Sequence, residues 1–280
     1  MNLEFSIEET VKTRYSTRTY TDQPVSSETK EKINTYISTL SNPFSVKVSF
    51  KLLESNTSTN SEKLGTYGVI KGANNYIGAT VEKSELALEA LGYEFEKLIL
   101  YLTSLGLGTC WLGGTFNRNS FKNAFEIKEN DIFPAISPFG YPSSKKRIAD
   151  SLVRMVAKSD HRKPWSDLFY NKNFTKLLSL ADAGAYAFPL EMIRLAPSAS
   201  NKQPWRIVQD GTTYHFYELQ AKGYSTSFGY DIQKVDLGIA ACHFHLAALE
   251  KDLKGEFKKL QTPTLDVPEQ TEYIFSWITA

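Results

Sequence analysis

Cysteine is scarce in this 280-residue sequence, and extended apolar stretches are missing. Cys110 and Cys242 are the only cysteines, so no disulfide framework can form, and no set of cysteines and histidines has zinc-site spacing. No run approaches the roughly 18 apolar residues of a membrane-spanning helix. The first residues also lack the apolar core of a signal peptide. These absences predict a reduced, cytoplasmic protein that does not associate with a membrane.

Net charge is nearly absent as well, because 32 Lys and Arg residues balance 31 Asp and Glu residues to give +1. No global field therefore points to nucleic acid, and any anion-binding site must be local. No carboxylate pair stands in a motif that would suggest acid-base hydrolysis. His243 and His245 are two residues apart on an expected helix, which suits neither a metal pair nor a triad. Hydrolytic and metal-dependent chemistry are thus not indicated.

Apolar periodicity predicts an alternation of helices and strands. Ser6 and Glu9 have capping-box spacing at the start of an N-terminal helix. Further helices are expected over 26–40, 84–105, 121–127, 143–156, 189–195 and 235–251. Strands are expected over 46–54, 75–81, 133–142 and 272–280, with a hairpin over 205–219. In the last strand, Tyr273, Phe275 and Trp277 are expected to share one face.

The element order after about residue 160 repeats the order before it. A Leu-Gly pair also recurs within each long helix, as Leu91-Gly92 and Leu237-Gly238. A glycine in the middle of a helix is costly unless another element packs closely against it. The repeat therefore predicts an internal duplication, with one half over 1–158 and the other over 159–280.

Each of the chemically distinctive segments offers a different kind of group. Segment 14–18, RYSTR, places two guanidinium groups around a hydroxyl, a combination that can bind a phosphate. Loop 196–205, APSASNKQPW, offers hydroxyl and amide groups on a backbone stiffened by proline. Loop 106–114, GLGTCWLGG, has glycines that let backbone groups approach a planar ligand. Taken alone, each also suits an ordinary role as a basic surface, a turn or a helix C-cap.

Together the segments resemble the nitroreductase family. RYSTR is similar to the family's Arg-x-Ser-x-Arg start, and APSASNKQPW matches its A-P-S-x-x-N-x-Q-P-W signature. The glycine loop, followed by GYP and KKR, resembles the family's flavin-face loop and phosphate tail. The resemblance covers about residues 7 to 275 and implies an α+β fold that binds FMN at an interface between two similar units.

The sequence departs from the family pattern in one respect. Family members carry the A-P-S-x-x-N signature soon after the arginine segment, whereas here it lies near residue 200. The first half has only LSNPFSVKV at the matching place, and the second half has RKPWSDLF where Arg-x-Ser-x-Arg would stand. Each half lacks what the other keeps. The chain therefore resembles single-chain members in which two halves form an internal pseudo-dimer, needing no partner subunit, with one composite site and a degenerate mirror site.

The resemblance assigns roles residue by residue. Arg14 and Ser16 would reach the FMN phosphate together with Lys145 and Arg147, while the choice between Lys145 and Lys146 stays open. Arg18 would lie near the flavin pyrimidine, and backbone groups of Leu112, Gly113 and Gly114 would face N5. The same cofactor site would include Tyr15 from the first half and, from the second half, Pro197, Ser198, Asn201 and Gln203.

The expected function is that of an FMN-dependent oxidoreductase. NAD(P)H would reduce the flavin, and a nitroaromatic, quinone or similar small acceptor would then take the electrons in a ping-pong reaction. FMN is expected rather than FAD because no GxGxxG strand-turn-helix motif is present. A flavoenzyme of the same fold with a different reaction and a non-catalytic flavin-binding protein remain the alternatives.

Overall fold

The computed structural model describes residues 4–54, 65–144, 161–226 and 228–280. Nearly all of the helix expected over 143–156 lies outside these residues, as do Lys145, Lys146, Arg147 and the expected boundary between the halves at 158.

The first half contains one antiparallel sheet and its helices. Helix α1 (Ile7–Thr13) is capped by Ser6, whose hydroxyl accepts from the Glu9 amide as the capping-box spacing predicts. The remaining elements are α2 (Ser27–Thr39), β1 (Val48–Glu54), β2 (Asn75–Glu82), α3 (Ala87–Ser104), β3 (Gly108–Thr109), α4 (Arg118–Ala124) and β4 (Asp131–Gly140). The sheet order is β1-β2-β4-β3.

The second half contains a larger sheet in the order β5-β6-β7-β9-β8. Its strands are β5 (Phe169–Asn171), β6 (Trp205–Asp210), β7 (Thr213–Leu219), β8 (Gly255–Lys258) and β9 (Thr271–Thr279). Its α-helices are α6 (Leu180–Ala183), α7 (Ala187–Leu195) and α8 (Gln233–Glu250). Strand β5 pairs in parallel with β6, whereas the other pairs are antiparallel.

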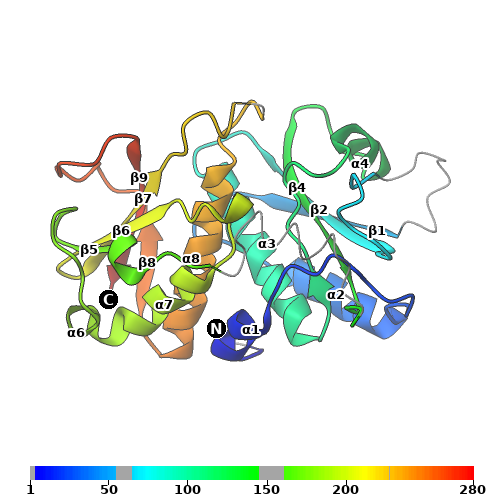
Figure 1. Ribbon diagram of the computed structural model, residues 1–280, viewed down its shortest axis with the longest axis horizontal. Coiled ribbons are helices and arrows are strands. Elements are labelled where there is room, and N and C mark those ends of the chain that lie inside the picture. The colour runs from blue at the N-terminus through cyan, green and yellow to red at the C-terminus, as the bar shows by residue number, and fades with distance from the viewer. Residues whose placement is uncertain (1–3, 55–64, 145–160, 227) are drawn as a thin grey trace.

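The two halves share one topology, which confirms the expected duplication. The order β6-β7-β9-β8 repeats β1-β2-β4-β3, and each long helix follows the second strand of its series. Helices α3 and α8 are 18 residues each. They lie side by side at the centre of the molecule, with one sheet on each side (Figure 1). The fold is therefore an α+β pseudo-dimer around a helical core.

Reciprocal glycine contacts join the two central helices. A Cβ on Gly92 would lie 2.1 Å from the carbonyl oxygen of Val235, and a Cβ on Gly238 would lie 1.9 Å from that of Glu89. Real Cβ atoms essentially never approach so closely. The Leu-Gly pairs therefore mark the crossing point at which each helix needs a glycine to admit the backbone of the other.

One expected detail of the last strand is wrong. Phe216 pairs with Phe275, but the next residue, Tyr217, pairs with Tyr273, so Ile274 forms an irregularity in β9. The extra residue reverses the alternation of side chains. Tyr273 consequently packs with Tyr217 on the face opposite to Phe275, away from the central core. The short strands β5 and β8 were not expected either.

Candidate functional site

A cavity of about 610 Å³ lies between the two halves. The first half contributes segment 14–18 and the glycine loop, and the second half contributes loop 195–201 and the start of α8. Most of the residues that the sequence assigned to a cofactor line it: Arg14, Tyr15, Ser16, Arg18, Leu112, Gly113, Gly114, Pro197, Ser198 and Asn201. The fold thus brings together segments that lie far apart in the sequence.

The basic segment is held against the glycine loop by its backbone. The Thr17 amide donates to the carbonyl oxygen of Thr109 at 2.8 Å, and Ser16 forms a parallel bridge with Thr109. Gly108 makes this approach possible, because a Cβ there would lie 2.5 Å from Thr17 Oγ1. Thr17 is therefore fixed inward, and its neighbours Ser16 and Arg18 border the cavity.

The glycine loop is anchored on its outer side. Leu112 exchanges backbone hydrogen bonds of 2.9 and 3.0 Å with Ile136 of β4. The Arg118 guanidinium donates to the carbonyl oxygen of Gly113 at 2.6 Å. A Cβ on Gly113 would meet Ile232 of the second half at 3.6 Å, an ordinary contact. The loop is thus fixed where it meets β4, and Gly113 faces Ile232 of the second half with room for little more than a Cβ.

Loop 195–201 adopts an unusual backbone conformation. Ser200 and Asn201 have φ of 49° and 53°, and Gln203, just beyond, has φ of 49°. Such left-handed conformations are uncommon for residues other than glycine and persist only where the surroundings hold them. Here Ser198 Oγ accepts from the Gln203 amide at 2.8 Å, and Asp236 Oδ1 accepts from the Ala199 amide at 2.9 Å.

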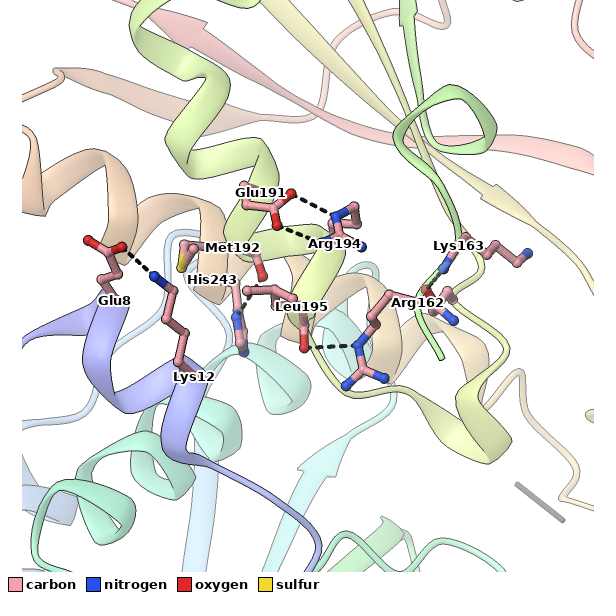
Figure 2. A network of polar contacts seen from close by, with 10 residues as sticks. Glu8, Lys12, Arg162, Lys163, Glu191, Met192, Arg194, Leu195 and His243 are labelled. Atoms are coloured by element: carbon pink, nitrogen blue, oxygen red, sulfur yellow. Dashed lines mark hydrogen bonds and ion pairs between the residues drawn. The ribbon is translucent and has the colours of Figure 1, made fainter. Parts of the chain in front are cut away.

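A strap over residues 161–163 completes the support of this loop. Arg162 Nε donates to the carbonyl oxygen of Leu195 at 3.2 Å (Figure 2). Asn201 Nδ2 donates to the carbonyl oxygen of His161 at 2.8 Å. Gln203 is only 2% exposed, and its side-chain oxygen accepts from the Lys163 amide at 2.8 Å. Gln203 therefore holds the strap rather than lining the cavity, in contrast to its expected place in the cofactor site.

The charge around the cavity is mainly positive. Lys12, Arg14, Arg18 and Arg162 line it, whereas Asp236 is the acidic residue of the lining that the structure describes. Arg18 Nε is buried and has no hydrogen-bond partner among the described residues. Sequence reasoning missed Arg162, because RKPW was interpreted only as a lost copy of the arginine segment. The cavity is suited to an anionic ligand.

An aromatic side chain packs in the first-half loop between α2 and β1, which has the same place in the element order as the loop between α7 and β6. Phe44 lies in the first-half loop that corresponds to loop 195–201. Its ring lies 5.1 Å from Phe275, 5.9 Å from Phe257 and 6.4 Å from Tyr93, centroid to centroid. Asn42 Nδ2 fixes the same loop by donating to Glu94 Oε1 at 2.5 Å. Aromatic contacts and a polar contact to α3 therefore fix this first-half loop.

A buried polar chain connects the cavity wall with both central helices. Trp111 Nε1 donates to Glu96 Oε2 at 2.7 Å, and Glu96 Oε1 lies 2.9 Å from His243 Nε2. His243 Nδ1 lies 3.0 Å from the carbonyl oxygen of Met192 (Figure 2). Since a carbonyl only accepts, Nδ1 carries a proton. His243 is a structural residue of the core.

Among the described residues, no helix is long and apolar enough to cross a bilayer. The same residues contain no group of at least three His, Cys, Asp or Glu side chains that could hold a metal ion.

The sequence matches the model of a family described as "Putative TM nitroreductase" over residues 6–248. A "putative nitroreductase" from Thermotoga maritima has the same fold, with a TM-score of 0.63 and 22% identity over 99% of this chain and 95% of that chain. A nitroreductase family protein from Clostridium novyi is 22% identical, with a TM-score of 0.40 over 52% of this chain and 91% of its own. An FMN-bound nitroreductase from Bacteroides fragilis is 18% identical, with a TM-score of 0.41 over 51% and 92%. No curated protein matches the sequence.

Proposed function

The chain belongs to this nitroreductase family, and from that premise we propose that it is an FMN-dependent oxidoreductase. In this proposal, NAD(P)H supplies electrons that pass through the flavin to a small acceptor such as a nitroaromatic or a quinone. The observation that carries the proposal is the composite cavity, in which the basic segment and glycine loop of one half face the Pro/Ser loop of the other.

The donor set of the cavity fits FMN. A terminal phosphate needs cations and hydrogen-bond donors, which Arg14, Arg162 and Ser16 supply. A ribityl chain needs hydroxyl and amide partners, which Ser198 and Ser200 offer nearby. The buried Arg18 Nε, without a partner among the described residues, is a donor that a ligand acceptor would satisfy.

The apolar part of the cavity suits a flat ring system. Leu112, Ile232 and Val235 are buried lining residues, and Gly113 and Gly114 carry no side chain that would fill the space between them. FMN, when bound, supplies a ring that accepts a hydride and passes electrons on. The residues themselves would bind and orient the flavin and exclude water from it. Arg18 would balance the negative charge that reduction places on the ring.

Each chain should bind one FMN, through residues of both halves. Arg14 and Ser198 border the same cavity within one chain, and in the first-half loop that precedes β1 the Phe44 side chain packs against Phe275. A second subunit is not required to complete the site. Two chains that associate would then carry two independent sites.

Flavin titration tests the proposal directly. Apo-protein should quench FMN fluorescence to an end point near one equivalent per chain. Truncating a residue in a desolvated charge-assisted contact costs about 2 to 5 kcal/mol, so Arg14→Ala should weaken binding by more than about tenfold. Arg194→Ala is the matched control, because Arg194 pairs with Glu191 on helix α7 and does not line the cavity.

Three outcomes would contradict the proposal. Absence of FMN binding, or equal loss in the Arg14 and Arg194 variants, would remove the phosphate assignment. Recovery of binding when Arg14→Ala and Ser198→Ala proteins are mixed would show that the site is shared between chains. NAD(P)H consumption with a panel of nitro compounds and quinones then separates an oxidoreductase from a flavin-binding protein without turnover.

A further inference from the structure

One carboxyl group in the cavity, that of Asp236, forms a hydrogen bond through only one of its two oxygens. The first turns of α8 present Ile232, Val235, Asp236 and Ile239 to the cavity, and Asp236 is the polar member of this stripe. Asp236 is 2% exposed, and its Oδ1 accepts from the Ala199 amide at 2.9 Å. Its Oδ2 is buried and has no hydrogen-bond partner among the residues that the structure describes.

The surroundings of Asp236 favour the neutral acid. Burial raises the pKa of Asp236 well above its usual value, the hydrogen bond from Ala199 lowers it, and the nearby Asp231 carboxylate raises it. Oδ1 accepts from an amide, so when Asp236 is protonated the proton lies on Oδ2. In that form Asp236 offers an O–H donor from one buried oxygen.

The other groups around the cavity do not accept this hydrogen bond. The Tyr224 hydroxyl lies 2.9 Å from Ser200 Oγ, and Asp231 accepts from Ser225 Oγ and from the Gln233 amide. The remaining charged residues of the wall are donors only: Lys12, Arg14, Arg18 and Arg162. A buried donor without an acceptor costs about 1 to 3 kcal/mol. An acceptor atom of a ligand in the cavity would satisfy this donor.

We propose that Asp236 donates a hydrogen bond from Oδ2 to an acceptor atom of the flavin ring, while Oδ1 holds loop 195–201 through Ala199. The proposal rests on the function proposed above. It makes Asp236 a cofactor-binding residue that joins the loop of the second half to the ring. It also makes flavin affinity sensitive to pH, because the carboxylate cannot donate.

Three variants separate donation from general packing. Asp236→Asn keeps an acceptor for Ala199 and a donor for the ligand, whereas Asp236→Leu keeps neither. Glu218→Gln is the control, because Glu218 is another buried acid, with a pKa raised to about 9 by burial and by the nearby Asp231, that does not line the cavity. Riboflavin serves as the probe beside FMN, since the FMN phosphate itself titrates near pH 6.

The first readout is the affinity for riboflavin as a function of pH. Wild-type affinity for riboflavin should fall as pH rises through the pKa of Asp236, and Asp236→Asn should remove this dependence. Asp236→Leu should bind on the order of tenfold more weakly at low pH. Glu218→Gln should have the riboflavin affinity of the wild type and the same dependence of that affinity on pH. Unchanged affinity in Asp236→Leu, or pH dependence that persists in Asp236→Asn, would overturn the proposal.

The midpoint potential of bound FMN supplies a second readout. A donor to the ring stabilises the electrons that reduction adds, so Asp236→Leu should make the potential more negative, while Asp236→Asn should restore it. Weaker binding with an unchanged potential would overturn the ring contact and leave only a structural role. If wild-type protein binds no flavin at all, the proposed function itself fails, which is a different result.

Discussion

Replacing Gly238 by alanine is the most direct test of how the two halves are joined. The new Cβ would lie 1.9 Å from the carbonyl oxygen of Glu89, and ordinary contact begins at 3.4 Å. The helices would have to separate by about 1.5 Å, or the backbone of α3 would have to deform. Neither neighbour is the end of a flexible side chain, so the strain cannot be relieved locally.

The size of the effect follows from two opposing terms. Overpacking a well-ordered core costs about 1 to 3 kcal/mol, and the rigid backbone contact places Gly238→Ala at the upper end. Alanine favours the helix over glycine by about 1 kcal/mol. The net loss should be about 2 kcal/mol, or roughly 4 to 8 °C in Tm for a chain of this size. FMN affinity should fall as well, because the cavity walls belong to the two halves.

Denaturant unfolding followed by circular dichroism measures this loss. Gly211→Ala is the control, because Gly211 has φ of 58° and the position that its Cβ would take has no described residue within 4 Å beyond its chain neighbours. That change introduces conformational strain alone, about 1 kcal/mol, and should leave FMN binding intact. A Gly238→Ala protein that is as stable as wild type, or more stable, would refute the close helix crossing.

The remaining predictions concern charge and packing at other positions. Burial, with help from Asp231, raises the pKa of Glu218 to about 9, so its contribution to stability is full at acid pH and is lost as pH rises towards 9. Glu218→Gln should remove about 1 kcal/mol per pH unit from the decline in unfolding free energy between pH 5 and 8. Phe44→Ala should cost about 3 kcal/mol in the same assay without altering the FMN stoichiometry. Arg162→Ala should weaken FMN binding and should also lower Tm, because Arg162 lines the cavity and holds loop 195–201. Normal FMN affinity in this variant would exclude Arg162 from the site.

Local patterns account for what the sequence predicted correctly. The Ser6 cap, the long, largely buried central helices and the glycine pairs each depend on neighbours in sequence or on one repeated contact. The irregularity at Ile274 does not, because a bulge depends on how β9 meets β7. A prediction based on strict alternation of side chains along the strand therefore missed it. The strand β8 is short, and its apolar content is too small to stand out.

In the candidate site too, residues within sequence motifs could be predicted, whereas residues that depend on tertiary contacts could not. Arg14, Ser198 and the glycine loop belong to motifs that can be read locally, and the fold brings them to one cavity. Asp236 carries no motif, and its importance appears only when its burial and its bond to Ala199 are known. Gln203 stands inside the signature, yet its side chain faces the strap.

Two halves joined in one chain can differ at corresponding positions. In a homodimer, a substitution that fills one site fills both, so a side chain such as Phe44 would abolish binding altogether. In a single chain it would fill one position and spare the other. The strap at 161–163 lies where the family resemblance would place a second arginine segment, and there it holds loop 195–201 and contributes Arg162 to the cavity lining. The two halves of one chain can thus contribute different loops to one cavity, and exact symmetry between them is not required.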